Sequence, residues 1–306
     1  MSTVLEPSAD TTMEELPPLQ ARQCRTWFHG HPAGRRLGAH VSNEPIRNFA
    51  LLQTGRPIAC AVFQERLDRR ARVLGVAVDP QHRGQQHGAR LLREASAHLT
   101  RDNSIREVLT EIESDNRRLP LSQRLLQAAG FAEGETTAEV YRGYVHTQTP
   151  DYWKDRTRLP VGFSCIAWRH LRPEQREKIR TETVPQWDVP YVLNPFRDMA
   201  NQEPLNSLVL CRENQEVVGW MVTHRLGDDS IRYSSIYVIP PLQQYGLAMP
   251  LMAHSILLHA QYAPAWRTRW IFHVPTEMQA MWRVATRRFA RHTNERAQVL
   301  TFRWDG

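Results

Sequence analysis

The chain reads Val78-Asp79-Pro80-Gln81-His82-Arg83-Gly84-Gln85-Gln86-His87-Gly88-Ala89 where an apolar segment gives way to one with helical spacing. Glycines at such a strand-to-helix turn let the backbone approach a ligand closely. The helix that follows adds the positive partial charge of its N-terminus, so the turn is suited to binding a phosphate. The spacing is neither G-x-G-x-x-G nor G-x-x-x-x-G-K-[ST], which excludes the dinucleotide-binding and P-loop motifs.

A second turn of this kind lies in the other half of the chain, at Val238-Ile239-Pro240-Pro241-Leu242-Gln243-Gln244-Tyr245-Gly246-Leu247-Ala248. At the offset that places Val238 opposite Val78, residues 56–62 align with 216–222, and residues 3–5 fall within the stretch opposite 163–166. Self-similarity at a fixed period indicates two copies of one fold. We therefore expect an N-terminal domain over residues 1–147, a linker over about 148–157 and a C-terminal domain over 158–306.

The apolar pattern predicts alternating strands and helices within the first copy. Strands are expected at 49–53, 58–64, 72–78, 107–113 and 138–145, and helices at 14–29, 89–99 and 119–129. The second copy repeats this order with an enlarged helical insert at 172–206. The expected fold class is α/β (mixed α+β), with a central sheet flanked by helices in each copy.

The amino-acid composition is typical of a globular protein. Hydrophobic residues make up 41% and charged residues 23% of 306 residues, enough for two cores. No apolar run approaches the roughly 18 residues of a membrane span, and the first residues lack the features of a signal peptide. We therefore expect a cytoplasmic protein with no membrane partner.

Charge and cysteine content narrow the class of partner. The net charge is +7, and 37 of the 39 basic residues are arginine, so a polyanionic partner is permitted but not required. The four cysteines lie far apart without a CxxC pair, which favours buried free thiols. Trp27-Phe28-His29-Gly30-His31 has no third ligand at zinc-site spacing, so no metal is expected.

Two further segments rich in aromatic and basic residues can be explained either by packing or by a functional role. Asp151-Tyr152-Trp153-Lys154 is typical of a linker that packs against a domain. The arginine- and tryptophan-rich C-terminal segment could stack bases and contact RNA, above all through a helix at 278–291. The alternation at 266–270 also fits a half-buried strand.

Both turns resemble the acyl-CoA motif of the GNAT family (GCN5-related N-acetyltransferases), V-x-P-x-x-[QR]-x-x-G-x-[GA]. The second copy matches it at every position, namely Val238, Pro240, Gln243, Gly246 and Ala248. The first copy matches at Val78, Pro80, Arg83 and Gly88, and has Gln86 where the family usually has glycine.

The first copy also resembles a later motif of this family. A strand ends at Asn116, and a helix ends in Gly130-Phe131. Leu126 stands where many members have a tyrosine that acts as general acid. The second copy lacks both the asparagine and the Gly-Phe ending.

The resemblance implies two tandem GNAT folds, as in mycothiol synthase and antibiotic-tailoring acyltransferases, each with a twisted mixed sheet and a splayed parallel strand pair that admits pantetheine. In the first copy it assigns acyl-CoA binding to Val76, Val78, Arg83, Gly84, Gln86, Gly88, Ala89 and Asn116. In the second copy it assigns the same role to Tyr237, Val238, Gln243, Gln244, Gly246 and Ala248.

The implied function is N-acyl transfer from acyl-CoA, most simply acetyl-CoA, to the amine of a small molecule. The amine must lose a proton, and Glu111 and Glu113 on one strand face are candidate catalytic bases, with a solvated strand face as the alternative. Tyr141 or Tyr144 could protonate the leaving thiolate. Two other functions stay open: transfer from an aminoacyl-tRNA, favoured by the arginine excess, and non-catalytic CoA binding.

Overall fold

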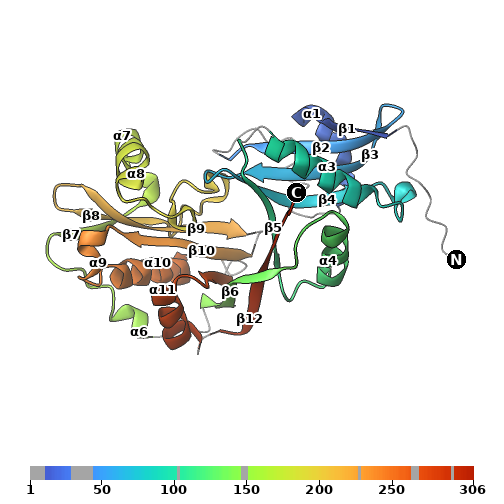
Figure 1. Cartoon of the computed structure of the whole chain (residues 1–306). Helices are drawn as coiled ribbons and strands as arrows, with labels where there is room; N and C mark the ends of the chain where they lie inside the picture. The colour runs from blue at the N-terminus through green and yellow to red at the C-terminus, as the bar shows by residue number, and fades with distance from the viewer. Residues whose placement is uncertain are drawn as a thin grey trace. The chain divides into compact units, whose positions relative to one another are not determined.

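The computed structural model describes residues 11–28, 44–101, 104–145, 151–226, 229–262, 269–290 and 293–306. These residues form two compact units (Figure 1). The first unit contains the described residues up to Thr137 together with residues 298–306, and the second contains residues 138–297. Each unit is a mixed sheet with helices, which confirms the α/β class.

The first unit has the sheet order β1-β2-β3-β4-β5-β12, in which only β4 and β5 are parallel. Its elements are β1 (Thr11–Glu15), α1 (Pro18–Ala21), η1 (Arg22–Phe28), β2 (Ile46–Gln53), β3 (Arg56–Glu65), β4 (Arg70–Val78), η2 (Pro80–His82), α3 (His87–Arg101), β5 (Glu107–Glu113) and α4 (Leu119–Ala128).

The second unit has the order β7-β8-β9-β10-β11-β6, in which only β10 and β11 are parallel. Its helices in the linker and the insert are α6 (Asp151–Lys154), η3 (Trp168–His170), α7 (Pro173–Lys178), η4 (Ile179–Thr183), α8 (Val184–Gln186), η5 (Tyr191–Leu193) and η6 (Met199–Asn201). The other elements are β7 (Phe163–Ala167), β8 (Leu208–Arg212), β9 (Val217–Leu226), β10 (Ser230–Val238), α9 (Pro240–Gln243), α10 (Ala248–Tyr262), β11 (Arg269–Pro275), α11 (Gln279–Val284) and η7 (Ala285–Phe289).

The last strand of each half pairs within the other half's unit. β6 (Glu135–Tyr144) continues into the second unit, where residues 138–144 pair with β11. β12 (Glu295–Arg303) ends in the first unit, where residues 299–303 pair with β5. The two halves of the sequence therefore exchange their final strands.

The predicted repeat holds from β3 onward. β9, β10, α10, β11 and β12 follow β3, β4, α3, β5 and β6 at a nearly constant offset along the sequence. The N-terminal prediction was wrong in part. Residues 11–15 form the edge strand β1, paired with β2, and the helical turns begin only at Pro18. β1 is thus the counterpart of β7, and residues 3–5, predicted for that place, lie outside the described residues.

Alternating side chains of the central strands divide the first unit's core between two faces. Phe49 and Leu51 of β2 pack with Leu91 and Leu92 of α3. The intervening Ala50 and Leu52 pack with α1 and η1. Helices therefore cover both faces of this sheet, as the period-two pattern requires.

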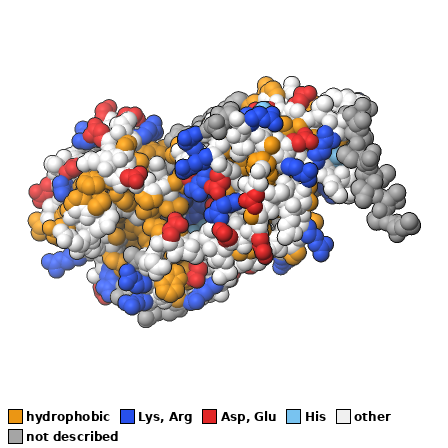
Figure 2. Space-filling view, viewed as in Figure 1, with side chains coloured by type: hydrophobic (Ala, Val, Ile, Leu, Met, Phe, Trp, Pro, Cys, Tyr) orange, Lys and Arg blue, Asp and Glu red, His pale blue; other side chains and the backbone are white. Residues whose placement is uncertain are grey.

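The second unit has one larger core, and its helix α10 differs from α3 in character. α10 contains no charged residue, whereas α3 carries Arg90, Arg93 and Glu94. On the face drawn in Figure 2, the second unit shows more apolar surface than the first. Trp153 of the linker is buried in this core, as predicted for a linker that packs against a domain.

The cysteines confirm the expectation of free thiols. Cys24, Cys60 and Cys211 are buried, Cys165 is half-buried, and all four are unbonded. The histidines of the predicted His29-Gly30-His31 cluster lie outside the described residues. Within the described ranges, no helix is both long and apolar enough to cross a membrane.

Candidate functional site

The two central parallel strands of the first unit separate partway along their length. β4 pairs with β5 only over residues 70–72 and 107–109. At Leu74 the register of β4 against β3 shifts by a β-bulge. A bulge bends its strand, so residues 75–78 keep β3 on one edge while no described strand pairs with the other.

The second unit repeats this geometry. β10 pairs with β11 only over residues 230–233 and 269–272. Its bulge is at Ser234, the position that corresponds to Leu74 in the repeat. Each unit therefore has the splayed parallel pair that the resemblance to the GNAT family implies.

The loop after β4 leaves several backbone N–H groups available. Arg83 Nε donates to the carbonyl of Val78 at 3.3 Å, which fixes the start of the loop. Gly84 and Gln86 have φ of +82° and +59°. The described hydrogen bonds give the N–H groups of residues 84–86 no acceptor, and the first N–H groups of α3 have no intrahelical acceptor. This arrangement is suited to a pyrophosphate.

Gly88 lies in the first turn of α3, next to β4 and α4. A Cβ there would be 3.4 Å from Val78 Cγ2 and 3.3 Å from Leu125 Cδ1. The glycine therefore lets the helix N-terminus pack against the free part of β4. Ala89 is buried beside it.

Gln86 adopts a backbone conformation that favours glycine, so we expect Gln86→Gly to stabilise the protein. A left-handed conformation costs a non-glycine residue roughly 1–2 kcal/mol, and the greater unfolded-chain entropy of glycine offsets part of this. The expected gain is about 0.5–1 kcal/mol in the free energy of unfolding, measured by urea denaturation. Gln85→Gly, next to it and without positive φ, should destabilise, and a gain from both changes would contradict the assignment.

The corresponding loop of the second unit uses its N–H groups internally. Tyr245 N donates to Leu242 O at 3.1 Å, Gly246 N to Gln243 O at 3.2 Å, and Met249 N to Gly246 O at 3.2 Å. Fewer donors are therefore left for an anion, although this loop matches the motif at every position.

The strand edge beside each loop also differs. Val76 and Val78 of β4 are half-buried. Their counterparts Ile236 and Val238 lie in the second unit's core, with exposed fractions of 8% and 4%. Neighbouring Tyr237 stacks on Trp220, with ring centroids 4.8 Å apart. The second unit thus packs this strand into its own core.

Gln243 and Gln244 lie on the exposed outer side of the second loop, and Ala248 is half-buried at the start of α10. Gln243 Nε2 donates to the carbonyl of Val238 at 2.9 Å, as Arg83 does to Val78. Both motif side chains therefore brace the end of the preceding strand.

Glu111 and Glu113, the predicted bases, lie on one face of β5 and are half-buried. Glu111 forms ion pairs with Arg66 at 3.3 Å and Arg72 at 3.1 Å. Arg66 lies 45 residues away in the chain, and sequence reasoning missed it because no local pattern links such partners. These contacts fix the Glu111 carboxylate in position.

Asn116 shapes the turn between β5 and α4. Its Oδ1 accepts from Arg118 N at 2.9 Å, and its carbonyl accepts from Leu119 N at 2.8 Å. Leu126, at the position of the family's tyrosine, is buried in the first unit's core. Gly130 ends the helix region with φ of +88°, followed by the buried Phe131.

Tyr141 and Tyr144, considered as acids, belong to the second unit. Tyr141 is buried, and its hydroxyl donates to Glu139 at 2.5 Å. Burial, followed by the hydrogen bond to Glu139, raises the pKa of Tyr141 to about 12. The hydroxyl of Tyr141 is therefore bonded to a neighbour on its own strand, β6, which pairs with β11.

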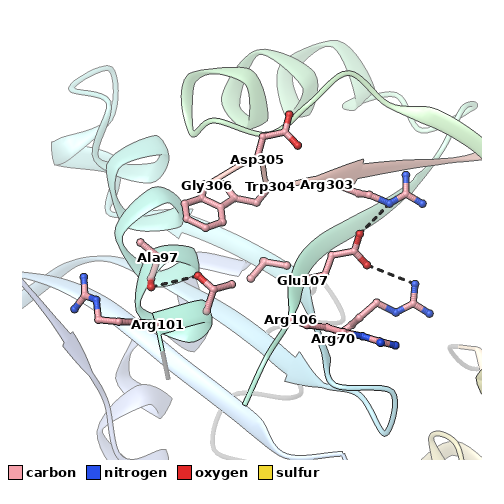
Figure 3. Close-up of a pocket in the computed structure, with 11 residues that line it drawn as sticks. Arg70, Ala97, Arg101, Arg106, Glu107, Arg303, Trp304, Asp305 and Gly306 are labelled. Atoms are coloured by element: carbon pink, nitrogen blue, oxygen red, sulfur yellow. Dashed lines mark hydrogen bonds and ion pairs between the residues drawn. The ribbon is translucent and has the colours of Figure 1, made fainter. Parts of the chain in front are cut away.

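An open cavity of about 880 Å³ lies at the opposite end of β4 and β5 from the loop (Figure 3). Arg70 and Arg303 line it, but both contact Glu107, at 3.6 and 3.0 Å (Figure 3). Both arginines are thus paired with Glu107, and Arg101 and Arg106 also line the cavity. None of the predicted site residues lines this cavity.

Comparisons with known proteins agree with the fold. Residues 13–131 match the model of the acetyltransferase (GNAT) family. A tandem GNAT protein from the clavulanic acid biosynthesis pathway has a TM-score of 0.63 at 11% identity, over 97% of this chain and 99% of that one. A GCN5-related N-acetyltransferase from Sphaerobacter thermophilus has a TM-score of 0.54 at 14% identity, over 97% and 96% of the two chains.

A further similar structure is the GCN5-related glucosamine N-acetyltransferase region of a fungal multi-domain GH3 β-N-acetylglucosaminidase. It has a TM-score of 0.64 at 13% identity, over 97% of this chain and 38% of that one. No curated protein sequence matches the chain significantly. The family match over residues 13–131 and the likeness to these structures lead to one conclusion: residues 13–131 resemble the GNAT family in sequence, and the chain has the tandem GNAT fold.

Proposed function

We propose that the protein is an acyl-CoA-dependent N-acyltransferase that takes an acetyl group from acetyl-CoA and transfers it to the amine of a small molecule. We assign acyl-CoA binding to the first unit. The observation that carries this assignment is the contrast between the loops: the N–H groups of residues 84–86 have no acceptor among the described hydrogen bonds, whereas Tyr245 and Gly246 donate within their own loop.

The residues of the first unit fit such a ligand. The N–H groups of the loop and of the first turn of α3 would hold the pyrophosphate, with Arg83, Gly84, Gln86, Gly88 and Ala89 around it. The unpaired edge of residues 75–78, which includes Val76 and Val78, offers pantetheine its backbone groups. Asn116 lies in the turn that follows β5, the strand on the other side of the gap. Acyl-CoA itself supplies the activated thioester.

The chain's own groups would then promote direct attack by the amine. A backbone N–H of β4 beyond the bulge can stabilise the developing oxyanion. An alkyl ammonium with a pKa near 10 must lose its proton, which costs about 4 kcal/mol at pH 7. Glu111 and Glu113 are the carboxylates that we propose as proton acceptors, through a bridging water.

Calorimetric titration with acetyl-CoA tests the binding half of the proposal. We expect one saturable site per chain, because only the first loop offers its donors. Release of CoA on adding a panel of small amines would then test the transfer. Two equivalent sites per chain would contradict the assignment to the first unit, and no binding at all would overturn the acyl-CoA proposal.

The same experiment separates the alternative functions. Exposed Arg283 and Arg287 on α11 and η7 are the structural feature that favours an RNA partner. RNA retained by the purified protein, detected as absorbance at 260 nm, together with no acetyl-CoA binding, would favour an aminoacyl-tRNA donor. Binding without CoA release from any amine would favour a non-catalytic role.

The four cysteines form no disulfide, which agrees with the reducing cytoplasm as the location of the protein.

A further inference from the structure

A buried histidine begins helix α3, at the end of the loop that follows β4. His87 is 5% exposed. The residue at the equivalent position of the second unit is Leu247, which is 1% exposed. In the first unit, whose loop N–H groups have no acceptor among the described hydrogen bonds, a titratable ring therefore takes the place that a leucine side chain fills in the second unit.

The contacts of His87 leave one ring nitrogen without a partner. Nε2 lies 3.1 Å from Gln85 Oε1, within the loop. Because an amide oxygen only accepts, Nε2 carries the proton and Nδ1 carries a lone pair in the neutral ring. Nδ1 is buried and has no hydrogen-bond partner among the described residues. Buried polar atoms are nearly always paired, so this exception calls for an explanation, and an unpaired lone pair of this kind can accept a proton.

Two basic side chains act on the ring from the elements around it. His82 lies in the loop, with its ring centroid 6.3 Å from that of His87, and Arg90 lies one turn along α3. Burial first, and then His82 and Arg90, lower the pKa of His87 below its ordinary 6.5. A pyrophosphate held by the adjacent N–H groups would add negative charge and act in the opposite direction.

We propose that His87 takes up a proton when acyl-CoA binds to the first unit, which makes binding tighter in mildly acidic solution. The inference rests on the proposed function, because it requires the loop to hold the pyrophosphate. A group whose pKa is higher in the complex gains protons on binding, so affinity falls as pH rises from the pKa of the free protein through that of the complex. We expect acetyl-CoA to bind about three- to tenfold more tightly at pH 6 than at pH 8.

Calorimetry of the full chain with acetyl-CoA measures this directly. Titrations at pH 6, 7 and 8, each in two buffers of different ionisation enthalpy, give the number of protons taken up per ligand. His87→Leu introduces the side chain that Leu247 has in the second unit. This variant should lose most of the uptake and bind about equally at the three pH values. Protonation of the ligand's own phosphates is common to parent and variant and cancels in the comparison.

Two further variants separate His87 from its surroundings. His82→Gln removes the neighbouring ring and should keep most of the uptake. His87→Asn keeps a polar group without the basic nitrogen, and it replaces His87→Leu if the leucine variant does not fold. Equal uptake by the parent and both His87 variants overturns the inference, as does loss of the uptake in His82→Gln alone. If the parent fails to bind acetyl-CoA at any pH, the proposed function fails instead.

Discussion

Gln86→Glu is expected to weaken acetyl-CoA binding about thirtyfold, equivalent to about 2 kcal/mol. Gln86 is exposed in the loop after β4 and already has positive φ. Glutamate has nearly the same shape, so the change adds a charge without altering the backbone. Two like charges about 5 Å apart repel by roughly 3 kcal/mol at an effective dielectric constant near 20, and salt reduces this at an exposed site. Calorimetric titration measures the loss.

Two comparison variants make the result specific. Gln86→Asn keeps a neutral amide that tolerates positive φ, so binding should stay within about threefold of the parent. Gln244→Glu makes the same charge change in the second loop, where Tyr245 and Gly246 donate internally, and should leave affinity almost unchanged. If Gln244→Glu abolishes binding and Gln86→Glu does not, the second unit is the acyl-CoA site.

Phe302→Ala is expected to destabilise the first unit by about 3–5 kcal/mol, although the residue lies near the end of the sequence. Phe302 is 1% exposed and packs in the core formed by α3 and β2–β5. A Cβ on Gly134 would be 2.7 Å from its ring, which shows how closely the site is filled. Hydrogen exchange should increase first in β3 and β5 and later in β8–β10.

A neighbour on the same strand provides the control. Gln298 is exposed on β12, so Gln298→Ala should change the free energy of unfolding by no more than about 0.5 kcal/mol. Urea unfolding followed by hydrogen exchange resolves the two units. Faster exchange confined to β8–β10 in Phe302→Ala would show that β12 stabilises the second unit instead.

The repeat allowed much of the fold to be predicted, because turn chemistry recurs at a nearly constant offset from β3 onward. It failed at the N-terminus, where Thr11–Glu15 is an edge strand without apolar alternation. The exchange of β6 and β12 has no sequence signal. The two strands occupy equivalent places in the repeat, so alignment cannot indicate which sheet each one joins.

The candidate site shows a similar division. The motif located both loops, yet it ranked the second copy as the better match. In the second copy the N–H groups of Tyr245, Gly246 and Met249 donate within the loop, a difference that the residue types do not indicate. Sequence could not show that Gln86 adopts the φ of a glycine, since side-chain identity does not determine a loop's dihedral angles. It also could not pair Glu111 with Arg66 and Arg72.

The exchange of final strands has a consequence for biosynthesis. β5 is complete once residue 113 has been translated, but the strand that covers its free edge ends at residue 303. The N-terminal unit therefore waits for β12 before its sheet can close, and the edge of β5 that β12 covers stays unpaired until then. Domains usually fold in order as they leave the ribosome, but the sheet of this one closes only after the strands β7–β11 of the second unit have been made. A nascent chain that stops early would leave that edge open to pairing with other chains.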